Sequence, residues 1–231
     1  LHNAEKFAQP VGARARGAPE AAYPDHLELA GYRGVPADER VDTAQAKKLR
    51  HGYYACVSYV DAQVGKVLAA LPRLGLESNT VVVLLGDHGY SLGEADHWCK
   101  DTNFEMDTRV PLIVRTPGLA KPGAPTGALT EYVDLYPTLA GLAGLTPPAD
   151  VDGRTLKGPL DDPAAKGRDC ALSQFSRPFR AGDPTIMGHS LRTETHRYTR
   201  WTEWAGGKIL AEELYDYAAG PSTSAAGPFP V

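Results

Sequence analysis

The stretch Val81–Gly89, which reads Val-Val-Val-Leu-Leu-Gly-Asp-His-Gly, decides the fold of this 231-residue chain. A run of branched apolar residues ends abruptly in a glycine, an acid, an imidazole and a second glycine. Such a run is typical of a strand buried on both faces of a parallel sheet. Ligands of open α/β sheets bind beyond the carboxyl ends of the strands. Asp87 and His88 therefore stand where such a fold places its chemistry.

The sequence on either side of this strand also predicts an α/β arrangement. Asp42 or Thr43 can cap the start of a helix. Apolar residues then recur at spacings of three and four, the pattern of an amphipathic helix: Leu49, Tyr53, Val57, Val60, Val64, Val67 and Leu71. Downstream, 110–114 is a second short apolar run, and 131–145 reads as a helix. Helix, short loop, buried strand and polar loop in this order favour the α/β class.

The character of the chain changes after residue 170. Four short stretches with strand-like alternation predict a small antiparallel sheet: 171–175, 186–193, 197–202 and 213–217. The predicted organisation has four parts: an irregular surface segment (1–41), an α/β region (42–150), the small antiparallel subdomain (151–217) and a disordered tail (218–231).

Composition excludes several classes of protein. The chain is 42% hydrophobic and 23% charged with a formal net charge of −4, which argues against a nucleic-acid partner. No eighteen apolar residues run together, so no membrane span is expected. Cys56, Cys99 and Cys170 show no CxxC spacing, which indicates neither a disulfide framework nor a zinc ribbon. Three free thiols, or one disulfide with one thiol left over, fit this pattern.

The loop after the buried strand is rich in chemistry-bearing residues. Residues 90–100 contain two acids, a histidine, a tryptophan and Lys100. Asp and Gly are ordinary turn residues, but this density exceeds what a turn needs and suits a small anionic substrate. Lys100 can act as a point charge for a sulfate or phosphate oxygen. Imidazole suits Zn²⁺ or Mn²⁺, whereas Ca²⁺ prefers oxygen ligands. Asp87 and His88 are two ligands, so others must come from elsewhere.

Several ordered motifs resemble the type I sulfatases, and most closely their iduronate-2-sulfatase-like branch within the alkaline phosphatase-like superfamily. The central motif is Gly86–Glu94 followed by Trp98-Cys99-Lys100 and Thr102-Asn103-Phe104. Further stretches that are similar to the family lie at 52–61, 108–113, 133–140, 186–193 and 213–216. The resemblance runs from about residue 40 to residue 217.

The resemblance implies both a fold and a site. The family fold is a mixed, largely parallel sheet flanked by helices, with a small C-terminal antiparallel sheet. Its members hydrolyse sulfate esters at a divalent metal, usually Ca²⁺. By resemblance, Asp87 and His88 bind the metal and Lys100 binds the sulfate group. Where the family often reads Gly-Glu-His-Gly, this chain reads Gly93-Glu94-Ala95-Asp96 followed by His97, so His97 either takes over a substrate contact or is a surface loop histidine. Tyr90 either lines the substrate pocket or packs over the loop. The expected substrate is a sulfated small molecule or saccharide, and the expected location is periplasmic, secreted or lysosomal.

The chain departs from the family at the nucleophile. The family nucleophile is a formylglycine made from the Cys or Ser of a C/S-x-P-S-R motif, which does not occur here. The chain therefore resembles the C-terminal portion of a sulfatase, whose partner is the N-terminal half that carries the formylglycine. We expect no activity from this chain by itself. Two alternatives stay open: a metal-dependent phosphoester hydrolase of the same superfamily, and a non-catalytic fragment or pseudoenzyme module.

Overall fold

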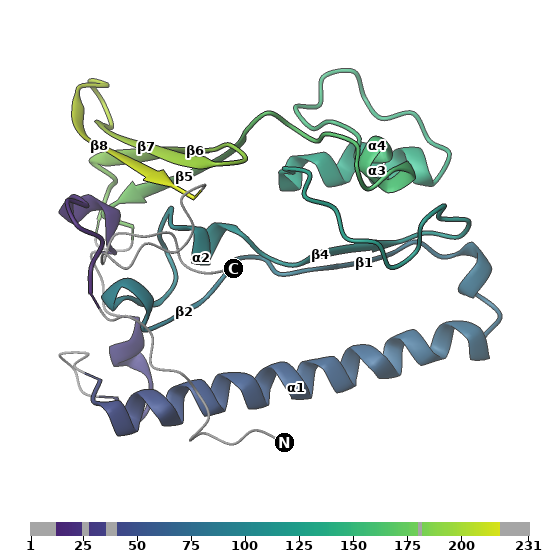
Figure 1. The fold of residues 1–231 in the computed structure, drawn as a ribbon, viewed down its shortest axis with the longest axis horizontal. Coiled ribbons are helices and arrows are strands. Elements are labelled where there is room, and N and C mark those ends of the chain that lie inside the picture. The colour runs from purple at the N-terminus through teal and green to yellow at the C-terminus, as the bar shows by residue number, and fades with distance from the viewer. Residues whose placement is uncertain (1–12, 25–27, 36–40, 180–181, 218–231) are drawn as a thin grey trace.

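The computed structural model describes residues 13–24, 28–35, 41–179 and 182–217, and it arranges them in three layers (Figure 1). The long helix α1 (Thr43–Arg73) forms one outer layer. The middle layer contains β1 (Val82–Leu85) and β4 (Leu112–Arg115). The opposite layer contains α3 (Leu135–Leu142), α4 (Lys157–Asp161) and a four-stranded sheet. Within these residues, no helix is both long and apolar enough to cross a bilayer.

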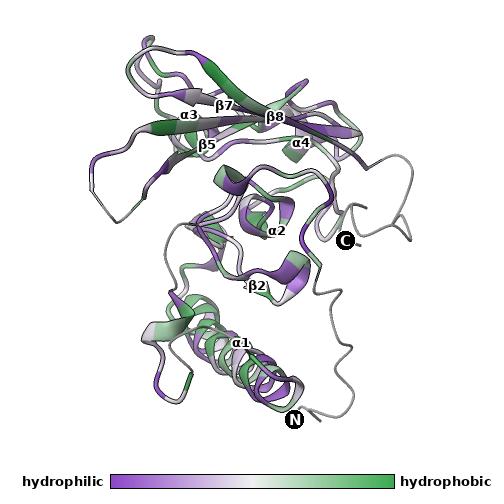
Figure 2. Ribbon diagram, turned by 90° about the vertical axis from the view of Figure 1, so that its left-hand side faces the viewer, coloured by the Kyte–Doolittle hydropathy of each residue, from purple (hydrophilic) through white to green (hydrophobic). Residues whose placement is uncertain are grey.

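Helix α1 begins where the sequence predicts. The Asp42 carboxylate accepts a hydrogen bond from the backbone N–H of Gln45 at 2.8 Å, which satisfies a donor that the helix itself leaves free. Apolar and polar residues alternate around the helix (Figure 2), but much of the apolar stripe is exposed: Val57, Val60 and Val67 are all more than half accessible. The predicted helix is confirmed, and its apolar face is largely uncovered in this chain.

Strand β1 differs from the prediction in its neighbours. It pairs antiparallel with β4, in the register Val82 to Arg115 and Leu85 to Leu112, and the two make a two-stranded sheet. Its residues are half-buried, and Leu85 is exposed. The expected burial on both faces within a parallel sheet is therefore not observed among the described residues. Such burial needs strands on both edges and cover on both faces, and here one edge is paired.

The C-terminal sheet is the best-formed part of the fold. It contains β5 (Ala171–Arg177), β6 (Ile186–Arg192), β7 (His196–Glu203) and β8 (Ile209–Asp216), each antiparallel to the next. All four predicted strands are confirmed, although the last begins earlier than expected. The expected α/β class with a small C-terminal antiparallel sheet is likewise confirmed.

Trp201 is the centre of the buried core. Its side chain is fully buried and clusters with Ala22, Tyr23 and Phe104, so one apolar core joins the N-terminal segment, the loop after β1 and the C-terminal sheet. Gly188 lies opposite Trp201 on β6. A Cβ atom at Gly188 would lie 2.5 Å from the Trp201 ring, so only glycine leaves room for the indole.

Short elements complete the chain. They are η2 (Glu20–Ala22), η3 (Leu29–Gly31), η4 (Glu77–Asn79), β2 (Ser91–Leu92), η5 (Glu94–Asp96), β3 (Trp98–Cys99), α2 (Glu105–Thr108) and η6 (Tyr132–Asp134). The helix predicted at 131–145 is therefore η6 followed by α3. The predicted division into a core and a C-terminal subdomain stays a prediction, and the predicted disordered tail, 218–231, lies outside the described residues.

Candidate functional site

Asp87 and His88 lie together in the turn after β1. His88 Nε2 lies 3.5 Å from Asp87 Oδ2, and the two side chains are 42% and 85% exposed, respectively. The backbone N–H of His88 donates to Asp87 Oδ1, and His88 Nδ1 lies 2.8 Å from the carbonyl oxygen of Gly89. A carboxylate oxygen and an imidazole nitrogen are thus presented side by side to solvent.

Backbone contacts with α2 hold the turn that carries this pair. Gly89 donates its N–H to the carbonyl oxygen of Asp107 at 2.8 Å. A Cβ atom at Gly89 would lie 1.6 Å from the carbonyl oxygen of Met106, so the backbones touch and only glycine fits. The Tyr132 hydroxyl donates to the carbonyl oxygen of Gly86. The turn is therefore rigidly placed between α2 and η6.

The donor set of this pair fits two ligands of a divalent cation and no more. Carboxylate oxygen is a ligand for Ca²⁺, and imidazole nitrogen is a better ligand for Zn²⁺ or Mn²⁺. Across the part of the chain that the structure describes, no cluster of three or more His, Cys, Asp or Glu side chains could hold a metal ion. A complete coordination sphere would need ligands in addition to Asp87 and His88.

Lys100 is held by an acid from the N-terminal segment. Its Nζ donates to Glu28 Oε1 at 2.7 Å, and the two side chains are 20% and 14% exposed. Burial by itself would lower the pKa of Lys100, but the hydrogen bond and charge of Glu28 outweigh burial and raise the pKa above its ordinary value. Lys100 is therefore a firmly charged ammonium group that already has an anionic partner.

Tyr90 lies in the same neighbourhood. Its hydroxyl lies 3.1 Å from the buried Cys99 Sγ and 3.0 Å from the hydroxyl of Tyr32, and its ring stacks on Tyr53 of α1 at a centroid distance of 5.3 Å. Burial raises the pKa of Tyr90, and the hydrogen bonds to Cys99 and Tyr32 act in the same direction. Tyr90 is thus a neutral hydroxyl. The segment that contacts Lys100 through Glu28 also contacts Tyr90 through Tyr32.

His97 is buried beside Asp107. Its side chain is only 5% exposed, and its Nε2 lies 3.7 Å from Asp107 Oδ2. Asp107 also accepts hydrogen bonds from Ser91 and Thr102, so it anchors the loop to α2. In this arrangement His97 packs inside the loop rather than on a surface that a substrate could touch. The proposed substrate contact of His97 therefore gains no support from its position.

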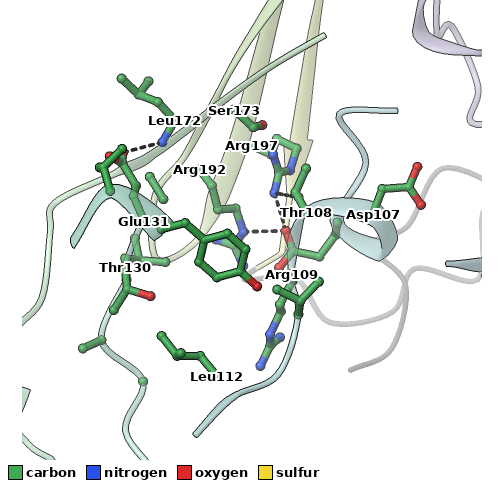
Figure 3. Close-up of a pocket in the computed structure, with 18 of the residues that line it drawn as sticks. Asp107, Thr108, Arg109, Leu112, Thr130, Glu131, Leu172, Ser173, Arg192 and Arg197 are labelled. Carbon is green, nitrogen blue, oxygen red and sulfur yellow. Dashed lines mark hydrogen bonds and ion pairs between the residues drawn. The ribbon is translucent and has the colours of Figure 1, made fainter. Parts of the chain in front are cut away.

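A cavity of about 820 Å³ lies between the turn after β1, strand β4 and the C-terminal sheet (Figure 3). Asp87 lines one part of it, and Arg109 projects into it from the chain before β4. Deeper in its wall, Glu105 accepts hydrogen bonds from Arg192 at 3.0 Å and from Arg197 at 2.7 Å. The sequence does not indicate this cluster, because its members lie far apart in the chain.

Comparison with known proteins identifies the family. A profile of the sulfatase family matches residues 5–145, and a profile described as N-sulphoglucosamine sulphohydrolase, C-terminal, matches residues 93–225. This chain belongs to the sulfatase family. It is 34% identical to iduronate 2-sulfatase of Mus musculus over 78% of this chain and 41% of the mouse protein. The chain thus spans less than half of the length of this relative.

Solved structures agree with this assignment. A structure of BT4656 in complex with its substrate D-glucosamine-2-N,6-O-disulfate has a TM-score of 0.67 and 27% identity, over 80% of this chain and 38% of that one. The phosphonate monoester hydrolase SpPMH from Silicibacter pomeroyi has a TM-score of 0.78 and 26% identity, over 95% of this chain and 46% of that one. The resemblance to a sulfatase fold is therefore confirmed.

Proposed function

We propose that this chain forms part of the active site of a sulfuric ester hydrolase. Asp87 and His88 would be two ligands of Ca²⁺, with Zn²⁺ or Mn²⁺ as alternatives, and Lys100 would bind the sulfate group. The observation that carries the proposal is the exposed Asp87–His88 pair on a rigid turn at the end of β1, in a chain of the sulfatase family. The bound metal would polarise a sulfate oxygen as a Lewis acid.

Lys100 would stabilise the reaction electrostatically. Cleavage of a sulfate ester places negative charge on the sulfuryl and leaving-group oxygens, and the positive charge of Lys100 would stabilise it. Glu28 raises the pKa of Lys100, which keeps the side chain charged over the physiological range. Tyr90 would contribute a neutral hydroxyl near the same place.

The nucleophile would come from another segment of polypeptide. None of Cys56, Cys99 and Cys170 lies in a C/S-x-P-S-R motif. We therefore infer a partner segment that carries a formylglycine and completes the metal site. The exposed apolar side chains of α1, together with the half-buried faces of β1, are the surface that this partner would cover. A sulfated saccharide is the favoured substrate, since BT4656 binds a disulfated glucosamine.

A second candidate is hydrolysis of a phosphoester or phosphonate ester. It is favoured by the likeness to a phosphonate monoester hydrolase and by the imidazole ligand, which suits Zn²⁺ or Mn²⁺. A third candidate is a non-catalytic module, which the missing nucleophile favours. The three candidate functions predict different activities for the chain once it is combined with its partner segment.

Complementation distinguishes these candidates. The purified chain is assayed with Ca²⁺ on 4-nitrophenyl sulfate and on a 4-nitrophenyl phosphonate ester, first by itself and then co-produced with the part of mouse iduronate 2-sulfatase that this chain does not match. We expect no turnover from the chain by itself, sulfate ester turnover from the complemented pair, and a loss of about 100-fold or more with Lys100→Ala. Faster phosphonate hydrolysis would support the second candidate. Absence of both activities from a folded complex would support the third.

A further inference from the structure

One short segment of the chain contacts both residues that we assign to substrate binding. Glu28 accepts the hydrogen bond from Lys100 Nζ, and Tyr32 makes the hydroxyl contact with Tyr90. Tyr32 also donates to Glu28 at 3.3 Å, so the two side chains of this segment are coupled. Glu28 and Tyr32 come from the two ends of η3, which lies 58 to 72 residues upstream of the groups that they contact.

Two contacts anchor the segment 28–35 to the rest of the protein. Leu29 is 2% exposed, so its side chain anchors η3 in the protein interior. Gln45 at the start of α1 donates from its side-chain amide to the carbonyl oxygen of Gly34 at 2.7 Å. The Glu28 carboxylate is therefore presented to Lys100 from a fixed position.

The Glu28 carboxylate offsets the positive charge of Lys100. The ammonium group carries one positive charge, and the Glu28 carboxylate 2.7 Å away carries one negative charge. The next acid that acts on Lys100 is Asp101, the adjacent residue. A sulfate group that approached this arrangement would meet a neutralised cation beside a carboxylate. Attraction between charges at this distance is strong in a partly buried site, and so is the repulsion between two anions.

We propose that Glu28 is an internal competitor for the anion site at Lys100, so that a sulfate group binds Lys100 by displacing the Glu28 carboxylate. The inference rests on the proposed function, in which Lys100 binds sulfate. It makes Glu28 a residue that determines which anions bind. A sulfate group held additionally by a metal replaces the carboxylate more readily than an anion that Lys100 alone must hold.

The test measures sulfate binding at Lys100 directly in the 231-residue chain. Chain labelled with ¹⁵N at lysine is titrated with sodium sulfate at constant ionic strength, and the Lys100 ammonium signal is followed by NMR after assignment with Lys100→Ala. Glu28→Gln removes the competing charge and keeps the size of the side chain. Glu20→Gln is the matched control, since Glu20 lies in the same N-terminal region but pairs with Arg14 at the surface.

We expect Glu28→Gln to bind sulfate at Lys100 about fivefold more tightly than the unmodified chain, the size expected for removal of one partly exposed ion pair. Glu20→Gln should change the affinity by less than about twofold. Unchanged or weaker sulfate binding in Glu28→Gln overturns the proposal while leaving the role of Lys100 intact. If the Lys100 signal does not respond to sulfate in any variant, the assignment of Lys100 in the proposed function fails instead.

Glu28→Asp covers the case in which the glutamine variant does not fold. Aspartate keeps the charge but is one methylene shorter, so it holds Lys100 less well. An affinity for sulfate above that of the unmodified chain supports the proposal, and an affinity equal to it or below it counts against the proposal. Circular dichroism of each variant establishes that the fold is retained before titration.

Discussion

Arg197 Nη2 donates to Glu105 Oε2 at 2.7 Å, with both side chains more than nine-tenths buried. This contact joins β7 of the C-terminal sheet to α2, the helix that supports the turn carrying Asp87 and His88. Arg192 of β6 donates to the same carboxylate oxygen. The position of the candidate metal ligands therefore depends on a buried charge cluster in a different part of the chain.

Arg197→Met should strongly destabilise the chain. It removes one partner of a buried ion pair and leaves Glu105 with only Arg192, a change that costs about 3 kcal/mol. The free energy of unfolding from urea denaturation checks this value. Arg200→Met is the matched control on the same strand, because Arg200 pairs with Glu212 at the surface and its loss should barely move the midpoint. Equal effects of the two substitutions would contradict the importance of the buried cluster.

Acid should weaken the fold through Glu105. Burial by itself would raise the pKa of Glu105, but the hydrogen bonds and charges of Arg197 and Arg192 outweigh burial and hold the pKa below its ordinary value. Ionised Glu105 therefore stabilises the folded state above the unfolded pKa of about 4.3, and this stability is lost as the pH falls through the folded pKa.

The test is the urea midpoint between about pH 6 and about pH 3, measured for the unmodified chain and for Glu105→Gln. The variant should be less stable at the upper end and should lose less stability on acidification. Glu77→Gln, which alters an exposed pair with Arg115, serves as the control and should keep the steep acid dependence. The same steepness in Glu105→Gln would rule out Glu105 as a source of the acid sensitivity.

Gly89→Ala should disrupt the turn that carries the candidate metal ligands. The new Cβ would lie 1.6 Å from a backbone oxygen that cannot move aside cheaply, so we expect a loss of about 2–3 kcal/mol in unfolding free energy. Gly65→Ala, in the open middle of α1, has no atom within 4 Å and should gain about 0.5–1 kcal/mol. A neutral effect of Gly89→Ala would show that the two backbones are farther apart.

Calcium binding should be weak and should depend on Asp87. Two ligands are a small part of the six to eight that Ca²⁺ takes, so we expect a dissociation constant on the order of 10⁻³ M for the chain by itself. Calorimetric titration of Asp87→Asn should lose this binding, whereas Asp96→Asn, which alters an exposed acid of η5, should keep it. Binding that survives Asp87→Asn would place the cation elsewhere.

Local signals predicted much of the fold. The start of α1 follows from Asp42, a residue whose side chain caps a helix by itself, and the C-terminal strands follow from alternation within each strand. Such features depend on neighbours in the sequence, so they can be recognised without knowledge of the tertiary structure. The family follows in the same way from Gly86–Glu94 and the ordered stretches around it.

The features that the sequence did not reveal depend on distant residues. The pairing of β1 with β4 and the exposure of α1 depend on which other elements are present to cover them. Glu28 precedes Lys100 by 72 residues, and nothing local to either residue indicates their contact. His97 is a loop histidine in sequence terms, and only its packing against Asp107 shows that it is buried.

The contacts of Arg177 on β5 determine when the N-terminal segment can become ordered during folding. It is 4% exposed and donates to the carbonyl oxygens of Ala21, Tyr23 and Asp101, the first of which lies 156 residues earlier. During synthesis the N-terminal segment has no Arg177 to bind until β5 has emerged. Contacts of such large sequence separation form slowly, because a long loop must close first. Residues 13–24 should accordingly be among the last to gain protection from hydrogen exchange during refolding.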